Sequence, residues 1–175
     1  MDSTEITTDT YVAPGADQTA ARYLAHAIEI ATDNVRNAGG PFGAVVVSAD
    51  GQVFEGVNRV TADLDPSAHA EVSAIRNACK ALGTFDLSGA VLYTSCEPCP
   101  MCLATSLWAR IDRVYFAANR HDAADAGFDD ALFYRYFEGE AGDRAIMPVA
   151  QETLPPVQRV APFTEWTELS TRTEY

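Results

Sequence analysis

The sequence predicts a single α/β domain in which parallel strands are sandwiched between helices. A length of 175 residues suits one domain with its own hydrophobic core. Hydrophobic residues make up 47% of the chain and charged residues 21%, close to the averages of globular domains. Between residues 43 and 118, short apolar runs alternate with segments of helical periodicity. This alternation is typical of parallel sheets that helices cover on both faces.

The first predicted helix follows a stretch without periodicity. Residues 1–18 are rich in Thr, Asp, Gly and Pro, so we expect a flexible acidic tail ahead of one domain formed by residues 19–175. From residue 19 onwards, apolar side chains recur at helical spacing as far as Val35. The stretch Asn37-Ala38-Gly39-Gly40-Pro41 ends this helix.

The next elements are a hairpin and a second helix. Residues 43–48 and 53–57 flank the turn Ala49-Asp50-Gly51, which predicts a hairpin of two buried strands. Asp65-Pro66 is typical of a helix start and Gly83 of a helix end. His69 is therefore predicted at the N-terminal end of this helix.

Further elements continue the alternation. A strand, a helix and a strand are predicted at residues 91–95, 98–110 and 114–118. Two more helices are predicted at residues 129–137 and 162–169. The prolines between residues 144 and 160 leave that stretch without an assignment.

The charge balance narrows the class of partner. Acidic residues outnumber basic residues by 25 to 12, giving a formal net charge of −13. This charge repels phosphate backbones, so we expect a small, nearly neutral substrate and no nucleic acid. No run approaches the roughly 18 apolar residues of a membrane span, so we expect no membrane partner. Four cysteines without an export signal favour reduced thiols in the cytoplasm.

Two short motifs predict a metal site. The first is His69-Ala70-Glu71, and the second is the cysteine-rich run Thr94-Ser95-Cys96-Glu97-Pro98-Cys99-Pro100-Met101-Cys102, in which Cys99 follows His69 by thirty residues. Cys99 and Cys102 lie three residues apart at a predicted helix start, which lets both thiolates face one ion. We predict one Zn²⁺ per subunit, held by His69, Cys99 and Cys102 with a fourth position open to water. Glu71 would take a proton from that water.

Two other interpretations of the cysteines remain open at this point. Cys96, Cys99, Cys102 and His69 could together close a structural zinc site, although Cys96, at the end of a strand, is expected to point away. Cys99 and Cys102 could instead form a thioredoxin-like redox couple, which leaves His69 and Glu71 unexplained. Cys79 lies on an apolar helical face and is expected only to pack.

The motifs resemble those of a known superfamily. H-x-E followed by P-C-x-x-C is the signature of zinc-dependent deaminases. Together with Gly39-Gly40-Pro41-Phe42-Gly43-Ala44, these motifs resemble the cytidine deaminase superfamily. The run His121-Asp122-Ala123-Ala124-Asp125-Ala126-Gly127-Phe128-Asp129-Asp130 and the ending Glu174-Tyr175 resemble the small bacterial guanine deaminases. The resemblance implies a three-layer αβα sandwich with a central, mostly parallel, five-stranded sheet, and hydrolysis of guanine to xanthine and ammonia.

The resemblance also implies a set of site residues. Glu71 and Asp130 would be catalytic, and the substrate contacts would be Phe42, Asn58, Ala70, Trp108, Asp129 and Tyr175. It further implies a homodimer in which the C-terminal segment, about residues 150–175, crosses to the partner and contributes Tyr175 there. Simpler readings exist for several of these positions: Asn58 as a turn residue, Phe42 and Trp108 as core, and either aspartate as a helix cap.

The metal motif indicates the type of reaction but does not identify the ring that is deaminated. Guanosine, ammeline, cytosine or another aminated heterocycle would suit the same chemistry as guanine. The tRNA adenosine deaminases share both motifs, but the acidic balance weighs against them. An inactive, zinc-stabilised binding module is the alternative from a different class.

Overall fold

The computed structural model describes residues 16–139, 142–151 and 156–174. Most of the expected tail, residues 1–15, lies outside this described part, and helix α1 (Ala16–Arg36) begins at once after it. The chain divides into two compact units, Met1–Tyr134 and Arg135–Tyr175. Within the described ranges, no helix is long and apolar enough to cross a membrane.

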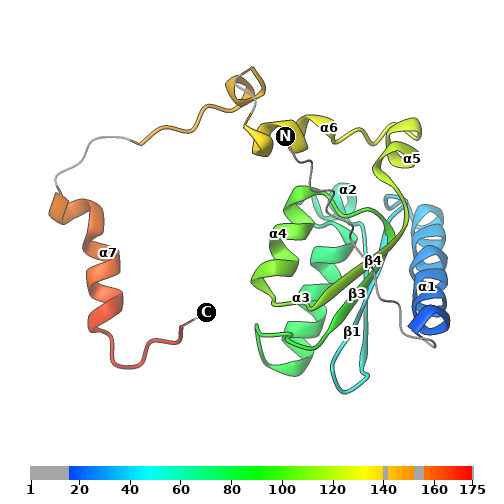
Figure 1. Cartoon of the computed structure of the whole chain (residues 1–175), viewed down its shortest axis with the longest axis horizontal. Helices are drawn as coiled ribbons and strands as arrows, with labels where there is room; N and C mark the ends of the chain where they lie inside the picture. Colours follow the sequence, from blue (N-terminus) through cyan, green and yellow to red (C-terminus); the bar gives the residue numbers. More distant parts are fainter. Residues whose placement is uncertain (1–15, 140–141, 152–155, 175) are drawn as a thin grey trace, which may run out of the picture. The chain divides into compact units, whose positions relative to one another are not determined.

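One mixed sheet forms the centre of the first unit (Figure 1). Its strands lie in the order β2-β1-β3-β4 and are β1 (Gly43–Val47), β2 (Val53–Val57), β3 (Val91–Cys96) and β4 (Arg113–Ala118). β1 pairs antiparallel with both β2 and β3, while β3 and β4 are parallel. The expectation of five mostly parallel strands is therefore wrong for the described residues, which form four strands and one parallel pair.

The hairpin explains this difference. Its turn reverses the chain after Val47, which pairs with Val53. Helix α3 (Ala70–Leu82) then carries the chain across to β3, on the other side of β1. β2, β3 and β4 consequently run in one direction, as alternation with helices predicts. The insertion of β1 between β2 and β3 makes two of the three pairings antiparallel.

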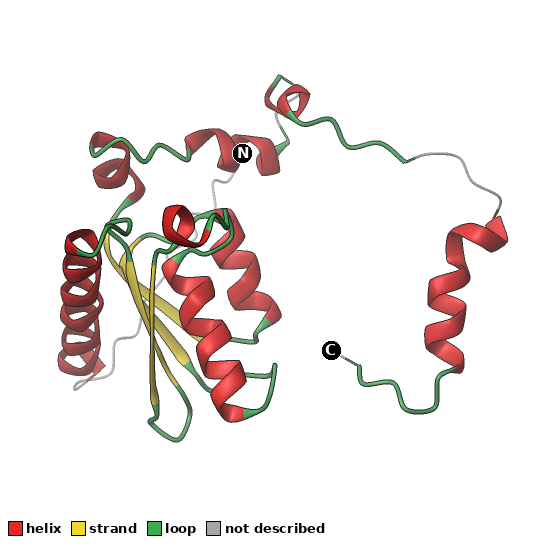
Figure 2. Cartoon of the chain, turned by 180° about the vertical axis from the view of Figure 1, so that it is seen from behind, coloured by secondary structure: helices red, strands yellow, loops and turns green. Residues whose placement is uncertain are grey.

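Helices cover both faces of the sheet, as predicted. α1 packs on one face, and α3 packs on the other with α4 (Pro100–Trp108) beside it (Figures 1 and 2). Side chains alternate across a strand, so β1 contributes to two clusters. Val46 packs with Leu92 on the α3 side, whereas Val45 packs with Tyr93 and Ala27 on the α1 side. The valine run is apolar throughout because both of its faces are buried.

Gly56 permits the close approach of α3 to β2. A Cβ at this position would overlap the backbone of α3 at the Ala70 carbonyl oxygen and the Ala74 nitrogen. We expect Gly56→Ala to lower the free energy of unfolding by about 1–3 kcal/mol, measured by denaturant titration, because overpacking displaces the helix. Gly142→Ala is the control, since a Cβ there meets nothing within 4 Å. Equal stability of both variants would contradict the proposed contact.

Local capping shifts several predicted boundaries. α3 begins at Ala70 instead of near Pro66, because Asp65 turns back to accept a hydrogen bond from the backbone of Ser67 at 2.8 Å. A short helix, α2 (Val60–Asp63), precedes this turn. α5 (Arg120–Asp125) was not predicted, although Asn119 and Asp122 form a capping box there. α6 (Ala131–Glu138) agrees closely with the predicted helix at residues 129–137.

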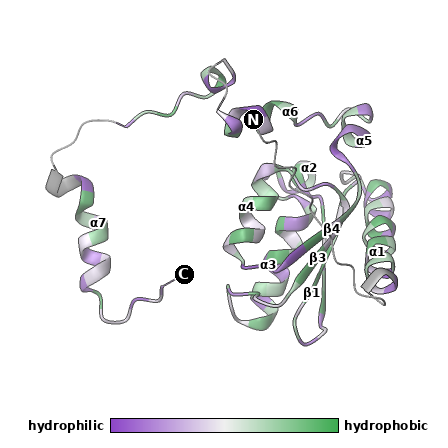
Figure 3. Ribbon diagram, viewed as in Figure 1, coloured by the Kyte–Doolittle hydropathy of each residue, from purple (hydrophilic) through white to green (hydrophobic). Residues whose placement is uncertain are grey.

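The second unit is built from short local contacts. It includes the end of α6, a 3₁₀ helix η1 (Asp143–Ile146) and α7 (Pro156–Glu168). Arg135 Nε lies 3.1 Å from an Asp143 oxygen, and the Tyr136 hydroxyl donates to the Met147 carbonyl at 2.9 Å. α7 begins earlier than residue 162 and contains Pro162 in its interior. No described side chain of this unit is buried, and Phe163 on α7 is 71% exposed. Hydrophobic and hydrophilic residues are interspersed along α7 (Figure 3).

Candidate metal centre

Two helix starts bring the predicted ligands together. His69 is the N-cap of α3, and Cys99 is the N-cap of α4; both have extended backbones, with ψ of 158° and 168°. Pro100 occupies the first turn of α4, where its missing N–H costs no helical hydrogen bond. Cys102 lies one turn further and is fully buried. Since β2 and β3 run in the same direction, the helices that follow them start at the same edge of the sheet.

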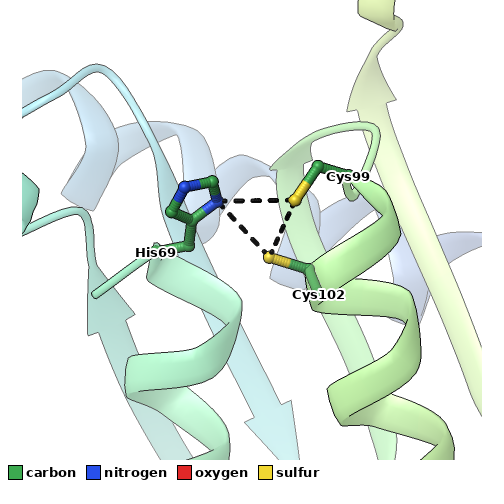
Figure 4. A group of neighbouring side chains, drawn as sticks. All are labelled: His69, Cys99 and Cys102. Atoms are coloured by element: carbon green, nitrogen blue, oxygen red, sulfur yellow. Dashed lines mark hydrogen bonds between the residues drawn. The ribbon is translucent and has the colours of Figure 1, made fainter. Parts of the chain in front are cut away.

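The three donor atoms form a compact triangle (Figure 4). His69 Nδ1 lies 3.6 Å from Cys99 Sγ and 3.5 Å from Cys102 Sγ, and the two sulfur atoms are 3.6 Å apart. Tetrahedral zinc with ordinary bond lengths requires N to S separations of about 3.6 Å and an S to S separation of about 3.8 Å. The chain's donor set and spacing therefore fit a zinc ion with three protein ligands.

Cys96 does not belong to the triangle. Its thiol points to the carbonyl oxygen of Asn119, at 3.8 Å, and burial raises its pKa to about 11. Among the described residues, the metal-binding group consists of His69, Cys99 and Cys102. The site therefore has the three-ligand form typical of catalytic zinc, and the closed four-ligand site is not formed. A redox couple of Cys99 and Cys102 would not explain why His69 lies within 3.6 Å of both sulfur atoms.

Protons are shared unequally within the triangle. Cys99 and Cys102 are joined by a hydrogen bond between their sulfur atoms, and this contact lowers the pKa of Cys99 to about 4 and raises the pKa of Cys102. His69 also interacts with Cys99, and this hydrogen bond raises the pKa of the imidazole. Negative charge is thus concentrated on Cys99, and a thiolate is the form of cysteine that binds metal.

Glu71 lies beside the triangle, in the first turn of α3. Its side chain is buried, with 6% of the residue exposed. Burial is the main cause that raises its pKa. A carboxyl group with a raised pKa can both accept and return a proton near neutral pH, which is the task that the sequence assigns to Glu71.

A cavity of about 270 Å³ opens at the triangle. The predicted site residues that line it are Phe42, His69, Glu71, Cys99, Asp129 and Asp130. Phe42 packs edge to face against Phe128, with ring centroids 5.0 Å apart. Phe128 and Phe133 add aromatic wall that the sequence did not single out. The cavity is therefore partly walled by flat apolar rings.

The two aspartates differ in their surroundings. Asp129 is exposed, and its carboxylate accepts a hydrogen bond from the Ala131 N–H at 2.9 Å, where α6 begins. Asp130 is partly buried, and burial together with the nearby Cys99 raises its pKa. The hydrogen bond at the start of α6 thus belongs to Asp129, and Asp130 is the carboxyl group whose pKa is affected by Cys99.

Three predicted substrate contacts that the structure describes are not among the residues that line this cavity. Asn58 accepts a hydrogen bond from the Val60 N–H at 3.3 Å, as a turn asparagine does, and Ala70 is fully buried in the core. Trp108 ends α4, at the end opposite the ligands, and is 66% exposed. Tyr175 lies outside the described residues.

A charged pair at the cavity was missed from the sequence. Glu97 and Arg120 both line the cavity, with Arg120 Nε 3.9 Å from a Glu97 oxygen. Glu97 lies inside the cysteine-rich run, so its position next to the ligands was a usable signal. Arg120 is the first residue of α5, which was not predicted. The capping pattern of Asn119 and Asp122 was the sequence signal that could have indicated this helix.

This chain is similar to known proteins over most of its length. Residues 17–118 match the cytidine and deoxycytidylate deaminase zinc-binding region. The guanine deaminase of Bacillus subtilis is 47% identical over 154 residues, which cover 87% of this chain and 97% of that protein. Its X-ray structure has a TM-score of 0.82 at 46% identity and covers 89% of this chain and 98% of that one.

Other relatives are similar over a smaller part. A structure solved in complex with 2,6-diaminopurine has a TM-score of 0.59 at 33% identity, covering 63% of this chain and 62% of that one. The tRNA-specific adenosine deaminase of Agrobacterium fabrum is 46% identical over 98 residues, which cover 53% of this chain and 64% of that protein. Similarity to the Bacillus subtilis protein therefore extends well beyond the stretch shared with the tRNA enzyme.

Proposed function

We propose that this chain, which belongs to the cytidine and deoxycytidylate deaminase zinc-binding family, converts guanine and water to xanthine and ammonia. The observation that carries the reaction class is the triangle of His69, Cys99 and Cys102, open to a cavity that Glu71 also lines. Guanine is favoured as the substrate because the similarity to a guanine deaminase covers most of both chains.

Glu71 carries out the proton transfers of the proposed reaction. When bound, zinc would lower the pKa of a water ligand to about 7 and so supply a nucleophile at neutral pH. Glu71 takes a proton from the attacking water and delivers it to the ring nitrogen next to the amino-bearing carbon. Glu71 then takes the remaining proton of that water, from the hydroxyl group now bonded to the ring carbon, and passes it to the amino group. The carbon–nitrogen bond breaks, the carbonyl group of xanthine forms, and ammonia leaves. Phe42 and Phe128 form an apolar wall on one side of the cavity.

Asp130 is the second proposed proton-transfer group. Its raised pKa and its place on the cavity wall suit a carboxyl group that assists substrate protonation. We expect Asp130→Asn to lower kcat by about 10²-fold or more, measured by ammonia release. Asp129→Asn keeps a side-chain oxygen that can cap α6 and is expected to retain most turnover. The opposite ranking would assign the role to Asp129.

A substrate panel tests the proposed function directly. Ammonia release is measured from guanine, guanosine, cytosine, adenine and ammeline, with the zinc content of the same preparation determined in parallel. We expect guanine to give the highest kcat/KM. Faster release from any other ring, by a protein with one zinc per subunit, would replace guanine as the substrate. No release from any ring would favour an inactive binding module.

The tRNA adenosine deaminases are the second candidate, because one of them is 46% identical over about half of this chain. The net charge of −13 opposes a polyanionic substrate. Binding of tRNA at low salt, where electrostatic attraction is strongest, would support this alternative. We further propose that the protein works in the cytoplasm, where reducing conditions keep Cys99 and Cys102 available for zinc.

We also propose a homodimer in which the C-terminal segment reaches the partner's cavity and contributes Tyr175. Apolar side chains lie exposed on α4, where Leu107 is 77% exposed, and on α7, where Phe163 is 71% exposed. Such surfaces gain stability when a second subunit covers them.

Complementation tests the exchange. Chains carrying Glu71→Gln are co-expressed with chains lacking Tyr175, so that a mixed dimer has one complete site only if Tyr175 acts in trans. We expect the mixed dimers to release ammonia although each parent alone does not. Mixed dimers without activity would show that Tyr175 acts within its own subunit. Activity of the chains lacking Tyr175 on their own would show that Tyr175 is dispensable.

A further inference from the structure

We propose that Tyr134, Arg120 and Glu97 form a brace that holds the backbone in front of Cys99 and thereby positions this ligand for the metal ion. The proposal rests on the metal site argued above. It concerns three side chains that are not ligands themselves. Tyr134 on α6 bonds to Pro98, and Arg120 on α5 bonds to Glu97. Arg120 and Tyr134 also contact each other.

The first attachment fixes Pro98. The Tyr134 hydroxyl, on α6, donates a hydrogen bond to the Pro98 carbonyl oxygen at 3.0 Å. Pro98 is fully buried and has no N–H, and Pro100 on the other side of Cys99 has none either. The backbone around Cys99 therefore has few donors of its own, and the carbonyl bond from Tyr134 is a direct restraint on the peptide unit that joins Pro98 to Cys99.

The second attachment fixes Glu97. One carboxylate oxygen of Glu97 accepts a hydrogen bond from the Arg120 backbone N–H at 3.0 Å, and the other lies 3.9 Å from Arg120 Nε. The Glu97 N–H in turn donates to the Ala118 carbonyl at 2.8 Å. Both the main chain and the side chain of Glu97 are thus bonded to the segment between β4 and α5.

Arg120 joins the two attachments. Its guanidinium carbon lies 4.5 Å from the centroid of the Tyr134 ring, within the range of a cation–π contact. The capping box of Asn119 and Asp122 fixes the start of α5 and so the direction in which Arg120 leaves the backbone. α5, α6 and the loop before α4 therefore meet at Glu97 and Pro98, immediately ahead of the ligand.

The brace acts on Cys99 more than on the other ligands. Cys102 is set by the regular turns of α4, and His69 by the start of α3. Cys99 is an N-cap with an extended backbone, so the orientation of its thiolate depends on the residues before it. Groups that orient a ligand from outside the coordination sphere typically account for a roughly 10- to 100-fold change in metal affinity or activity.

Two tyrosines on the same helix allow a matched test. Tyr134→Phe keeps the ring under Arg120 and removes only the bond to Pro98. Tyr136→Phe is the same chemical change and also removes one hydroxyl bond to a backbone carbonyl, that of Met147. Zinc affinity is measured by competition with a chromophoric chelator, together with thermal unfolding of the metal-free proteins.

We expect Tyr134→Phe to weaken zinc binding roughly tenfold or more, while Tyr136→Phe binds zinc as the wild type does. The metal-free Tyr134→Phe protein should unfold at the wild-type temperature, and saturating zinc should restore its kcat. Glu97→Ala should weaken zinc binding similarly, and Glu97→Gln, which keeps an acceptor for the Arg120 N–H, should recover part of it.

Unchanged zinc affinity of Tyr134→Phe would overturn the proposal, as would an equal loss in Tyr136→Phe or a loss explained by unfolding of the metal-free protein. The readout is independent of substrate. A wild-type protein that binds zinc but deaminates no compound in the panel would refute the proposed function. The brace would still be supported in that case if Tyr134→Phe weakens zinc binding and Tyr136→Phe does not.

Discussion

Glu71→Gln is expected to abolish turnover while the protein keeps its zinc. The glutamine side chain has nearly the same shape, but it cannot take a proton from water and return it to the substrate. General acid and base catalysis contributes about 10²- to 10⁴-fold, and Glu71 is proposed to act in both directions. Ammonia release should therefore fall by about 10³-fold or more, with an unchanged ratio of zinc to protein measured by atomic absorption.

Glu29→Gln is the matched control for this substitution. Glu29 lies on α1, and its side chain is 72% exposed. We expect wild-type activity from this variant. A Glu71→Gln protein that retains zinc and full activity would refute the role of Glu71. Loss of zinc in Glu71→Gln would instead make Glu71 a group that supports the ligands, because it packs in the same helical turn as His69.

The secondary structure of the first unit and its β1–β2 hairpin were largely predictable, whereas the pairing of β1 with β3 was not. Apolar runs located all four strands to within one residue at each end, because each strand contains a short run rich in valine, other aliphatic or aromatic residues. The pairing of β1 with β3 depends on the order of the strands across the sheet, in which β1 lies between β2 and β3. A run of valines is equally compatible with a parallel or an antiparallel neighbour, so the position of β1 between β2 and β3 left no mark in the sequence.

Prolines misled the prediction at the C-terminal end. The prolines between residues 144 and 160 were read as interruptions, yet α7 begins at Pro156 and continues past Pro162. Proline is well tolerated in the first turn of a helix, which accounts for Pro156. The structure gives no reason of this kind for Pro162, which lies in the helix interior.

The metal ligands were predictable because their chemistry depends on spacing along the chain. Two cysteines one turn apart at a helix start must lie close together, and the separation of Cys96 from them followed from its place at a strand end. The walls of the cavity depend on tertiary packing. Phe128 contacts Phe42 across more than eighty residues of sequence, and no local pattern reports such a contact.

Cys102→Ser is expected to remove the zinc and all measurable turnover. A serine hydroxyl does not replace a thiolate as a zinc ligand, and the substitution leaves only His69 and Cys99 of the three-residue group to hold the ion. Wild-type protein should gain about 2.7 kcal/mol of stability when free zinc exceeds its Kd about 100-fold. The Cys102→Ser protein should unfold at the same temperature with and without zinc.

Cys96→Ser separates the three-ligand site from a closed one. The Cys96 thiol faces the Asn119 carbonyl and not the triangle, so this variant should keep one zinc per subunit and its zinc-dependent gain in stability. A Cys96→Ser protein that loses zinc as completely as Cys102→Ser would establish a fourth protein ligand. In that case no coordination position would be left for water, and the proposed hydrolysis would fail together with the open site on which it depends.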